Sequence, residues 1–171
     1  GLQRTFCVVA VGQFIARKGF DVLLKAWKQI DSKAQLVLIG GGMLENEYRK
    51  YIQDHGYRNV EIIRFVPKEK VMLYLKAADL FVLPTREDIW GLVVNEALAS
   101  GIPVVSSDKC IAGLQMLKDN LGGYIVPADD PEALAKTIAT YMQLNESTQT
   151  EKQREALGKA KDYTIENIVS N

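Results

Sequence analysis

The chain has 171 residues, and its 21 basic and 21 acidic side chains give a formal net charge of zero. This balance gives no bulk electrostatic reason to expect nucleic acid or an anionic membrane as a partner. The length suits one domain, which buries roughly 70% of the surface that its unfolded chain exposes. Its two cysteines, Cys7 and Cys110, suggest neither a disulfide framework nor a cysteine-based zinc site, so a reducing compartment, the cytoplasm, is expected.

Strand and helix patterns alternate along the chain. Apolar runs of strand length are expected near 5–12, 35–39, 60–64, 79–83, 103–106 and 123–126. Helical periodicity is expected near 19–30, 43–54, 68–77, 91–100 and 131–144, followed by an exposed, charged helix from Glu146 to about Lys161. This order predicts an α/β fold, with a Rossmann-like, doubly wound parallel sheet and helices on both faces. No apolar stretch approaches the roughly 20 residues that cross a bilayer.

Ligands of doubly wound sheets bind beyond the carboxyl ends of the strands. Several segments of this chain follow predicted strand ends and are therefore expected at one edge of the sheet: Gly12, Gly40 to Gly42, Val66 and the loop 84–91. Arg17 and Lys18 follow the first of these strands. As a basic pair in a loop they are equally typical of a solvated surface, so the pattern alone leaves their role open.

The segment from Asp88 to Glu96 places two acids around the start of a predicted helix. The first amides of that helix, from about Gly91 to Val93, have no carbonyl partners and lie at the positive end of its dipole, which favours a diphosphate. Glu96, one turn beyond Leu92, could accept from the paired hydroxyls of a ribose. In the alternative interpretation, Asp88 only caps the helix and Glu96 is a solvated glutamate.

The string from Pro84 to Val105, PTREDIWGLVVNEALASGIPVV, closely resembles the donor-site signature of the retaining GT-B glycosyltransferases of family 4, group 1. In that family two glutamates seven residues apart flank an aromatic-Gly-Leu, and an apolar helix leads to Gly-x-Pro-Val-Val. Here the first acid is Asp88, one methylene shorter, with neighbouring Glu87 as the alternative. Glu96 is the second.

Further segments carry the same resemblance, which spans about residues 8 to 145. Lys18 matches the lysine of the family's Lys-Gly segment, which with an arginine after the first strand holds the donor diphosphate. The arginine position is Gln13, and this departure leaves Arg17 as the substitute. Val66 matches the position whose backbone contacts the nucleotide base, and Arg64 stands where a glycine is usual.

The resemblance implies a site for a nucleoside-diphosphate sugar, with no metal and no cofactor. Its implied catalytic residues are Lys18, Asp88 and Glu96. The implied donor-binding residues follow the same motifs: Gly12, Gln13, Arg17, Lys18, Gly40, Gly41, Val66, Glu87, Asp88, Ile89, Trp90, Gly91, Leu92, Val93 and Glu96.

The resemblance also implies a domain organisation. Residues 1–145 are expected to form the donor-binding domain and residues 146–171 the C-terminal helices, cut short inside the last one. The family's N-terminal domain, which holds a glycan or lipid-linked glycan acceptor, is expected to be missing, so this piece alone is expected to be inactive. Peripheral association of the full-length enzyme with the inner face of the membrane is left open.

Three other kinds of protein share parts of this pattern. A dinucleotide-binding oxidoreductase is disfavoured because the third glycine of its fingerprint would fall at Glu45. A sugar-nucleotide epimerase of the same architecture fits the segment 88–96 less well. A non-catalytic module that binds sugar nucleotides or a partner protein is supported only by the departures at Gln13 and Asp88. The single histidine, His55, is expected to be a surface or capping residue rather than a base.

Overall fold

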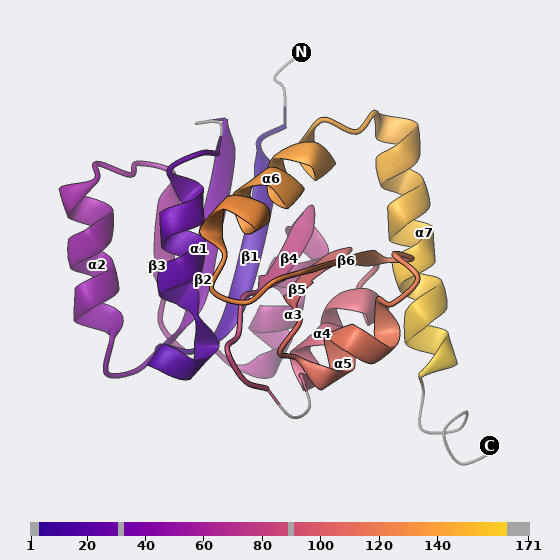
Figure 1. Cartoon of the computed structure of the whole chain (residues 1–171), viewed down its shortest axis with the longest axis horizontal. Helices are drawn as coiled ribbons and strands as arrows, with labels where there is room; N and C mark the ends of the chain where they lie inside the picture. Colours follow the sequence, from indigo (N-terminus) through magenta and orange to yellow (C-terminus); the bar gives the residue numbers. More distant parts are fainter. Residues whose placement is uncertain (1–3, 31–32, 89–90, 164–171) are drawn as a thin grey trace.

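A computed structural model describes residues 4–30, 33–88 and 91–163. It contains one six-stranded sheet with the order β3-β2-β1-β4-β5-β6, and every adjacent pair of strands is parallel (Figure 1). The predicted doubly wound sheet is confirmed. The strands are β1 (Phe6–Gln13), β2 (Ala34–Gly41), β3 (Val60–Ile63), β4 (Leu80–Leu83), β5 (Val104–Ser107) and β6 (Gly123–Val126).

All six predicted helices are present, with ends shifted by a few residues. They are α1 (Phe20–Trp27), α2 (Glu45–Asp54), α3 (Lys68–Ala77), α4 (Leu92–Ala99), α6 (Pro131–Met142) and α7 (Glu146–Asp162). Two short elements were not expected: a 3₁₀ turn, η1 (Ala16–Lys18), and the helix α5 (Ile111–Met116). Both are too short to show a helical period in the sequence.

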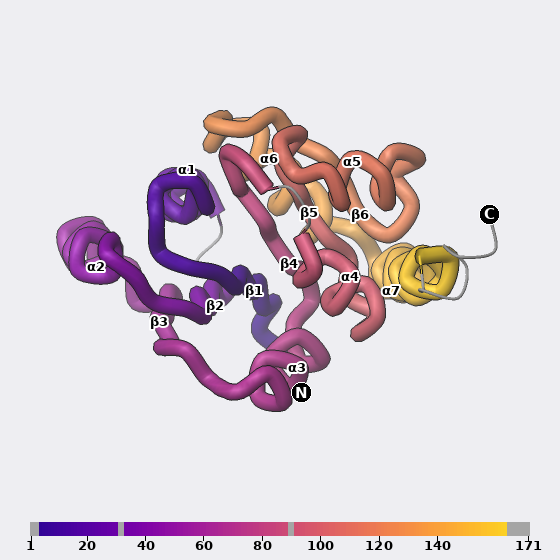
Figure 2. The backbone as a smooth tube through the Cα atoms, turned by 90° about the horizontal axis from the view of Figure 1, so that it is seen from below, coloured from indigo at the N-terminus to yellow at the C-terminus, as the bar shows by residue number. Residues whose placement is uncertain are grey.

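Buried side chains fall into two clusters, one on each face of the sheet. Alternation along β1 shows the division, since Val8 and Ala10 belong to the first cluster and Val9 to the second. Helices α1, α2 and α6 contribute to the first cluster, whereas α3, α4, α5 and α7 contribute to the second. In Figure 2, α1 and α6 lie on one side of β1 and β4, and α3 and α4 lie on the other.

The predicted charged helix α7 is exposed on one side only. Its Ala156 is fully buried, and Gly122 approaches so closely that an added Cβ would lie 3.0 Å from the Cα of Ala156. Lys152 donates to the carbonyl of Asn120, and Lys159 pairs with Asp119. The helix therefore packs on the domain through a small-residue contact with ion pairs beside it, and the expectation of an exposed helix holds for its outer face alone.

The strand order reverses between β1 and β4. Successive crossovers run from β1 through β2 to β3 on one side and from β4 through β5 to β6 on the other. The loops that leave the carboxyl ends of β1 and β4 therefore diverge, and a crevice opens between them. This topology brings the segment after Gln13 and the loop 84–88 to the same place.

Candidate functional site

A hollow of about 490 Å³ lies at the point where the strand order reverses. Its lining comes from the ends of β1 and β3, from the turn η1, from the loop after β4, and from the starts of α3 and α4. Ten of the predicted site residues line it: Gly12, Gln13, Arg17, Lys18, Val66, Asp88, Gly91, Leu92, Val93 and Glu96. Four others complete the lining without having been predicted: Val11, Phe65, Lys68 and Val71.

The remaining predicted residues do not line this hollow. Gly40 and Gly41 line a second hollow beside it. The exposed Glu87 contributes its backbone carbonyl, which accepts from Arg17 and from Thr85, and its carboxylate is not part of the lining. Because Asp88 lies in the hollow, it is the better match to the first acid of the signature. Ile89 and Trp90 lie outside the described residues.

Lys18 and Asp88, which both line the hollow, form an ion pair. The Nζ of Lys18 lies 2.5 Å from Oδ2 of Asp88, and the exposed fractions of the two side chains are only 17% and 11%. The backbone of Asp88 is fixed in turn, since its amide donates to the carbonyl of Lys109 and its own carbonyl accepts from the amide of Ile111. A mostly desolvated, charge-assisted contact of this kind holds both groups in place.

Glu96 faces the hollow from α4 and pairs with Lys68, the first residue of α3. The Nζ of Lys68 lies 3.0 Å from Oε1 of Glu96, and the lysine side chain is 72% exposed against 27% for the glutamate. Such an exposed contact contributes little to stability and can exchange readily. Each acid of the hollow is therefore paired with a lysine of the same hollow, one pair rigid and the other loose.

The start of α4 supplies the backbone donors that the sequence predicts. The helix begins at Leu92 with Gly91 in the capping position and no side-chain cap, and the amide of Val94 already donates to the carbonyl of Gly91. The amides of Leu92 and Val93 precede the first helical bonds and border the hollow. The alternative interpretation, that Asp88 only caps this helix, is wrong, because Gly91 is the capping residue and Asp88 pairs with Lys18.

Comparison with known proteins decides the family. The sequence profile described as "Glycosyl transferases group 1" matches residues 3–162. The chain belongs to this family.

Two curated glycosyltransferases are similar to this chain in sequence. The amylovoran biosynthesis glycosyltransferase AmsK of Erwinia amylovora is 29% identical over 153 residues, covering 83% of this chain and 37% of AmsK. The putative colanic acid biosynthesis glycosyltransferase WcaL of Salmonella typhimurium is 32% identical over 154 residues, covering 82% of this chain and 37% of WcaL. The chain thus spans 37% of the length of each relative.

A similar solved structure is that of Anabaena Alr3699/HepE in complex with UDP and glucose. It is 20% identical, with a TM-score of 0.82, and covers 92% of this chain and 44% of HepE. A likeness at this identity supports the fold alone. The sequence-based assignment to the group 1 glycosyltransferases and to their fold is confirmed.

Gln13, which the resemblance aligns with the family's arginine, lines the same hollow as Arg17. The side chain of Arg17 is exposed and donates to the carbonyl of Glu87 at 3.2 Å. Among the described residues, no carboxylate forms an ion pair with it. Arg17 therefore has the freedom to direct its charge toward an anion in the hollow.

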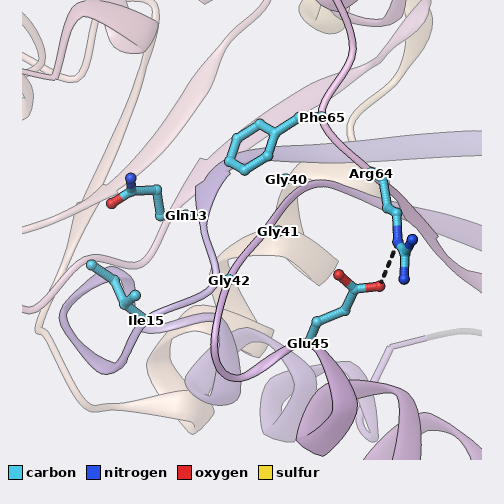
Figure 3. A pocket seen from close by; sticks show the side chains of 8 residues that line it. All are labelled: Gln13, Ile15, Gly40, Gly41, Gly42, Glu45, Arg64 and Phe65. Carbon is cyan, nitrogen blue, oxygen red and sulfur yellow. Dashed lines mark hydrogen bonds and ion pairs between the residues drawn. The ribbon is translucent and has the colours of Figure 1, made fainter.

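The second hollow, of about 470 Å³, shares Gln13 and Phe65 with the first. Figure 3 shows its floor along Gly40 to Gly42, with Gln13 on one side and the Arg64–Glu45 pair on the other. Gly40 permits β2 to approach β1 here, because a Cβ at this position would lie 1.8 Å from the carbonyl oxygen of Gly12. The ring of Phe65, 64% exposed, stands above the floor.

Other features lie apart from the two hollows. His55 is the C-cap residue of α2, where it stacks on Tyr51, so its predicted capping role is confirmed. Cys7 is half-buried and Cys110 is buried, and both are free thiols. Within residues 4–30, 33–88 and 91–163, no cluster of three metal-binding side chains was found, and no helix there is long and apolar enough to span a membrane.

Sequence reasoning missed Phe65 and Lys68 as lining residues. Both flank the predicted Val66 in the segment Phe65-Val66-Pro67-Lys68, which follows a strand end. Position after a predicted parallel strand was the signal that could have identified them. The pairing of Lys68 with Glu96 depends on how α3 and α4 lie together, which no local pattern encodes.

Proposed function

We propose that this chain is the donor-binding part of a glycosyltransferase that moves a hexose-type sugar, with retention of configuration, from a nucleoside diphosphate to an acceptor held elsewhere in the full protein. The observation that carries the proposal is the single hollow that gathers Lys18, Asp88, the start of α4 and Glu96. Membership of the group 1 family supplies the transferase class.

The diphosphate is assigned to the space between Lys18, Arg17 and the first amides of α4. The amides of Leu92 and Val93 offer hydrogen-bond donors at the positive end of a helix dipole. In the reaction, the bond between the anomeric carbon and the phosphate oxygen breaks, and negative charge grows on the departing diphosphate. Donors aimed at that charge in a partly desolvated site lower the barrier.

The two acids are assigned to sugar hydroxyls. Glu96 accepts from the paired ribose hydroxyls, and Asp88, deeper in the hollow, accepts from the sugar that is transferred. Both carboxylates must turn from lysine partners to hydroxyl partners when the donor enters. Val66 also lines the hollow, and its backbone is assigned to the base.

The acceptor is proposed to be a glycan or lipid-linked glycan, bound by the N-terminal domain of the full-length enzyme in the cytoplasm, at or near the inner face of the membrane. The names of AmsK and WcaL support a role in glycan biosynthesis. No metal is assigned a part in the transfer, because Lys18, Arg17 and the helix amides supply the positive charge.

Calorimetric titration of this chain with UDP, GDP and ADP and their sugar conjugates, with and without magnesium, tests the proposal. One nucleotide is expected to bind without magnesium. Glu96→Ala should weaken its binding by about 1.5–3 kcal/mol, the range for hydrogen bonding to a charged acceptor. Glu61→Gln, at an exposed β3 position outside both hollows, is the matched control. Equal affinity of Glu96→Ala and the parent would remove Glu96 from the ribose site.

A further inference from the structure

The turn η1, which carries Arg17 and Lys18, is held by the loop that follows β4. Two backbone carbonyls of the turn accept from this loop. The carbonyl of Arg17 accepts from the amide of Arg86 at 2.8 Å and from Oγ1 of Thr85 at 3.0 Å, and the carbonyl of Ala16 accepts from Nη1 of Arg86 at 2.6 Å. A single 3₁₀ turn has little internal stability, so these external bonds decide where it lies.

Backbone contact reinforces the link. Gly19, directly after the turn, has a φ of 69°, and a Cβ there would lie 2.0 Å from the carbonyl oxygen of Pro84. The two segments are therefore in direct contact, and only glycine fits at this position. The turn has no room to shift toward the loop without disturbing β4.

Arg86 joins three segments with one guanidinium group. Its Nη1 and Nη2 each lie 2.9 Å from an oxygen of Asp21, in the first turn of α1, and its Nε lies 2.6 Å from Oδ1 of Asp129. Asp129 lies between β6 and α6 and has a positive φ of 56°. A planar fork with fixed donors can hold these partners at once, whereas a lysine ammonium cannot reproduce the bidentate contact.

Arg86 itself does not line the donor hollow. Its side chain is 30% exposed, and its guanidinium group contacts Asp21, Asp129 and the turn η1. A residue of this kind acts on a ligand only through the groups that it places. The groups that it places are Arg17 and Lys18.

We propose that Arg86 is a positioning residue that, together with Asp21, fixes Arg17 and Lys18 where they meet the donor diphosphate. The diphosphate part of this inference rests on the proposed function. The clamp itself, the link from Arg86 through η1 to the basic pair, is a property of the ligand-free protein.

Amide hydrogen exchange of the ligand-free chain tests the clamp. The amides of Lys18 and Gly19 donate to the carbonyls of Ile15 and Ala16 and are protected only while the turn is closed. Exchange at these two amides is expected to be at least tenfold faster in Arg86→Lys. The control is Arg49→Lys, on the exposed face of α2, which should leave both amides unchanged. Unchanged exchange in Arg86→Lys would overturn the clamp.

Affinity measurements test the link to the diphosphate. With whichever base the parent binds, Arg86→Lys is expected to weaken the nucleoside diphosphate about tenfold and the bare nucleoside less than twofold. Asp21→Asn removes the carboxylate partner and leaves the guanidinium, so it should reproduce the same split if Arg86→Lys folds poorly. Equal weakening of both ligands would show a general loss of structure and refute the positioning role. If the parent binds no nucleotide, the proposed function fails, and the exchange result still decides the clamp.

Discussion

Replacing Lys18 by methionine gives the sharpest test of the site's electrostatics. The substitution keeps most of the aliphatic stem and removes the ammonium group that lies 2.5 Å from Asp88. The carboxylate of Asp88, 11% exposed, then remains in the hollow without its cation. Leaving a largely buried charged acceptor without its partner costs about 1–3 kcal/mol. For a domain of this size, a loss of about 2 kcal/mol lowers the melting temperature by roughly 4–8 °C.

Urea denaturation of the parent, the two single variants and the double variant isolates the interaction energy of the Lys18–Asp88 pair. Lys18→Met is expected to lose about 2 kcal/mol, and Asp88→Asn less than about 1 kcal/mol because the freed lysine can turn to water. The double variant should recover most of the loss, which gives a coupling energy of at least about 1 kcal/mol. Lys136→Met, at an exposed position on α6, is the matched control. If Lys18→Met and this control agree within about 0.5 kcal/mol, the pair is not desolvated as argued.

Two further predictions concern the frame of the site. Gly40→Ala should lower the free energy of unfolding, measured by urea denaturation, by about 3 kcal/mol, because β2 must move away from β1. Gly158→Ala is the control: no atom lies within 4 Å of its added Cβ, so it should stabilise the chain by about 0.5–1 kcal/mol. A small effect at Gly40 would refute the close approach. Burial raises the pKa of Asp21, but hydrogen bonds from Arg86 outweigh it and hold the pKa below the ordinary 3.8. The ionised carboxylate of Asp21 therefore stabilises the fold above pH 3.8, and this stabilisation is lost as the pH falls through the folded-state pKa. Between about pH 5 and pH 2, Asp21→Asn should lose less stability than the parent. Acid denaturation followed by circular dichroism would measure the difference.

The sheet could be predicted because its strands are buried on both faces. Runs such as Leu36 to Ile39 and Leu80 to Leu83 are continuously apolar, and each is followed by a helical period, which together specify a parallel arrangement. The helix α5 could not be predicted in the same way. Its six residues include Gly113, whose position against Ser106 leaves no room for a side chain, so tertiary packing rather than helix propensity defines the segment.

Most lining residues of the first hollow could be predicted, but their pairings could not. Strand ends and the signature after Pro84 identified ten lining residues of the first hollow. Which acid meets which lysine depends on distances between elements that are remote in the sequence. The same limit explains why the sequence left a capping role open for Asp88, and why Arg86, inside the signature itself, carried no sign of its contacts with Asp21 and Asp129.

The charges that line the first hollow bear on how it binds a diphosphate as proposed, with Gln13 where the resemblance expects an arginine. Three cations and two carboxylates line it, which leaves one net positive charge, on Arg17. When a donor enters as proposed, sugar hydroxyls replace the lysines as partners of Asp88 and Glu96, so Lys18 becomes available to the phosphates without any loss of hydrogen bonds to the acids. A nucleotide without a sugar brings no hydroxyl to Asp88, so separating the desolvated Lys18–Asp88 pair weakens its binding. Sugar-bearing donors should therefore bind this hollow more tightly than the free diphosphate, and Asp88→Asn should abolish that difference.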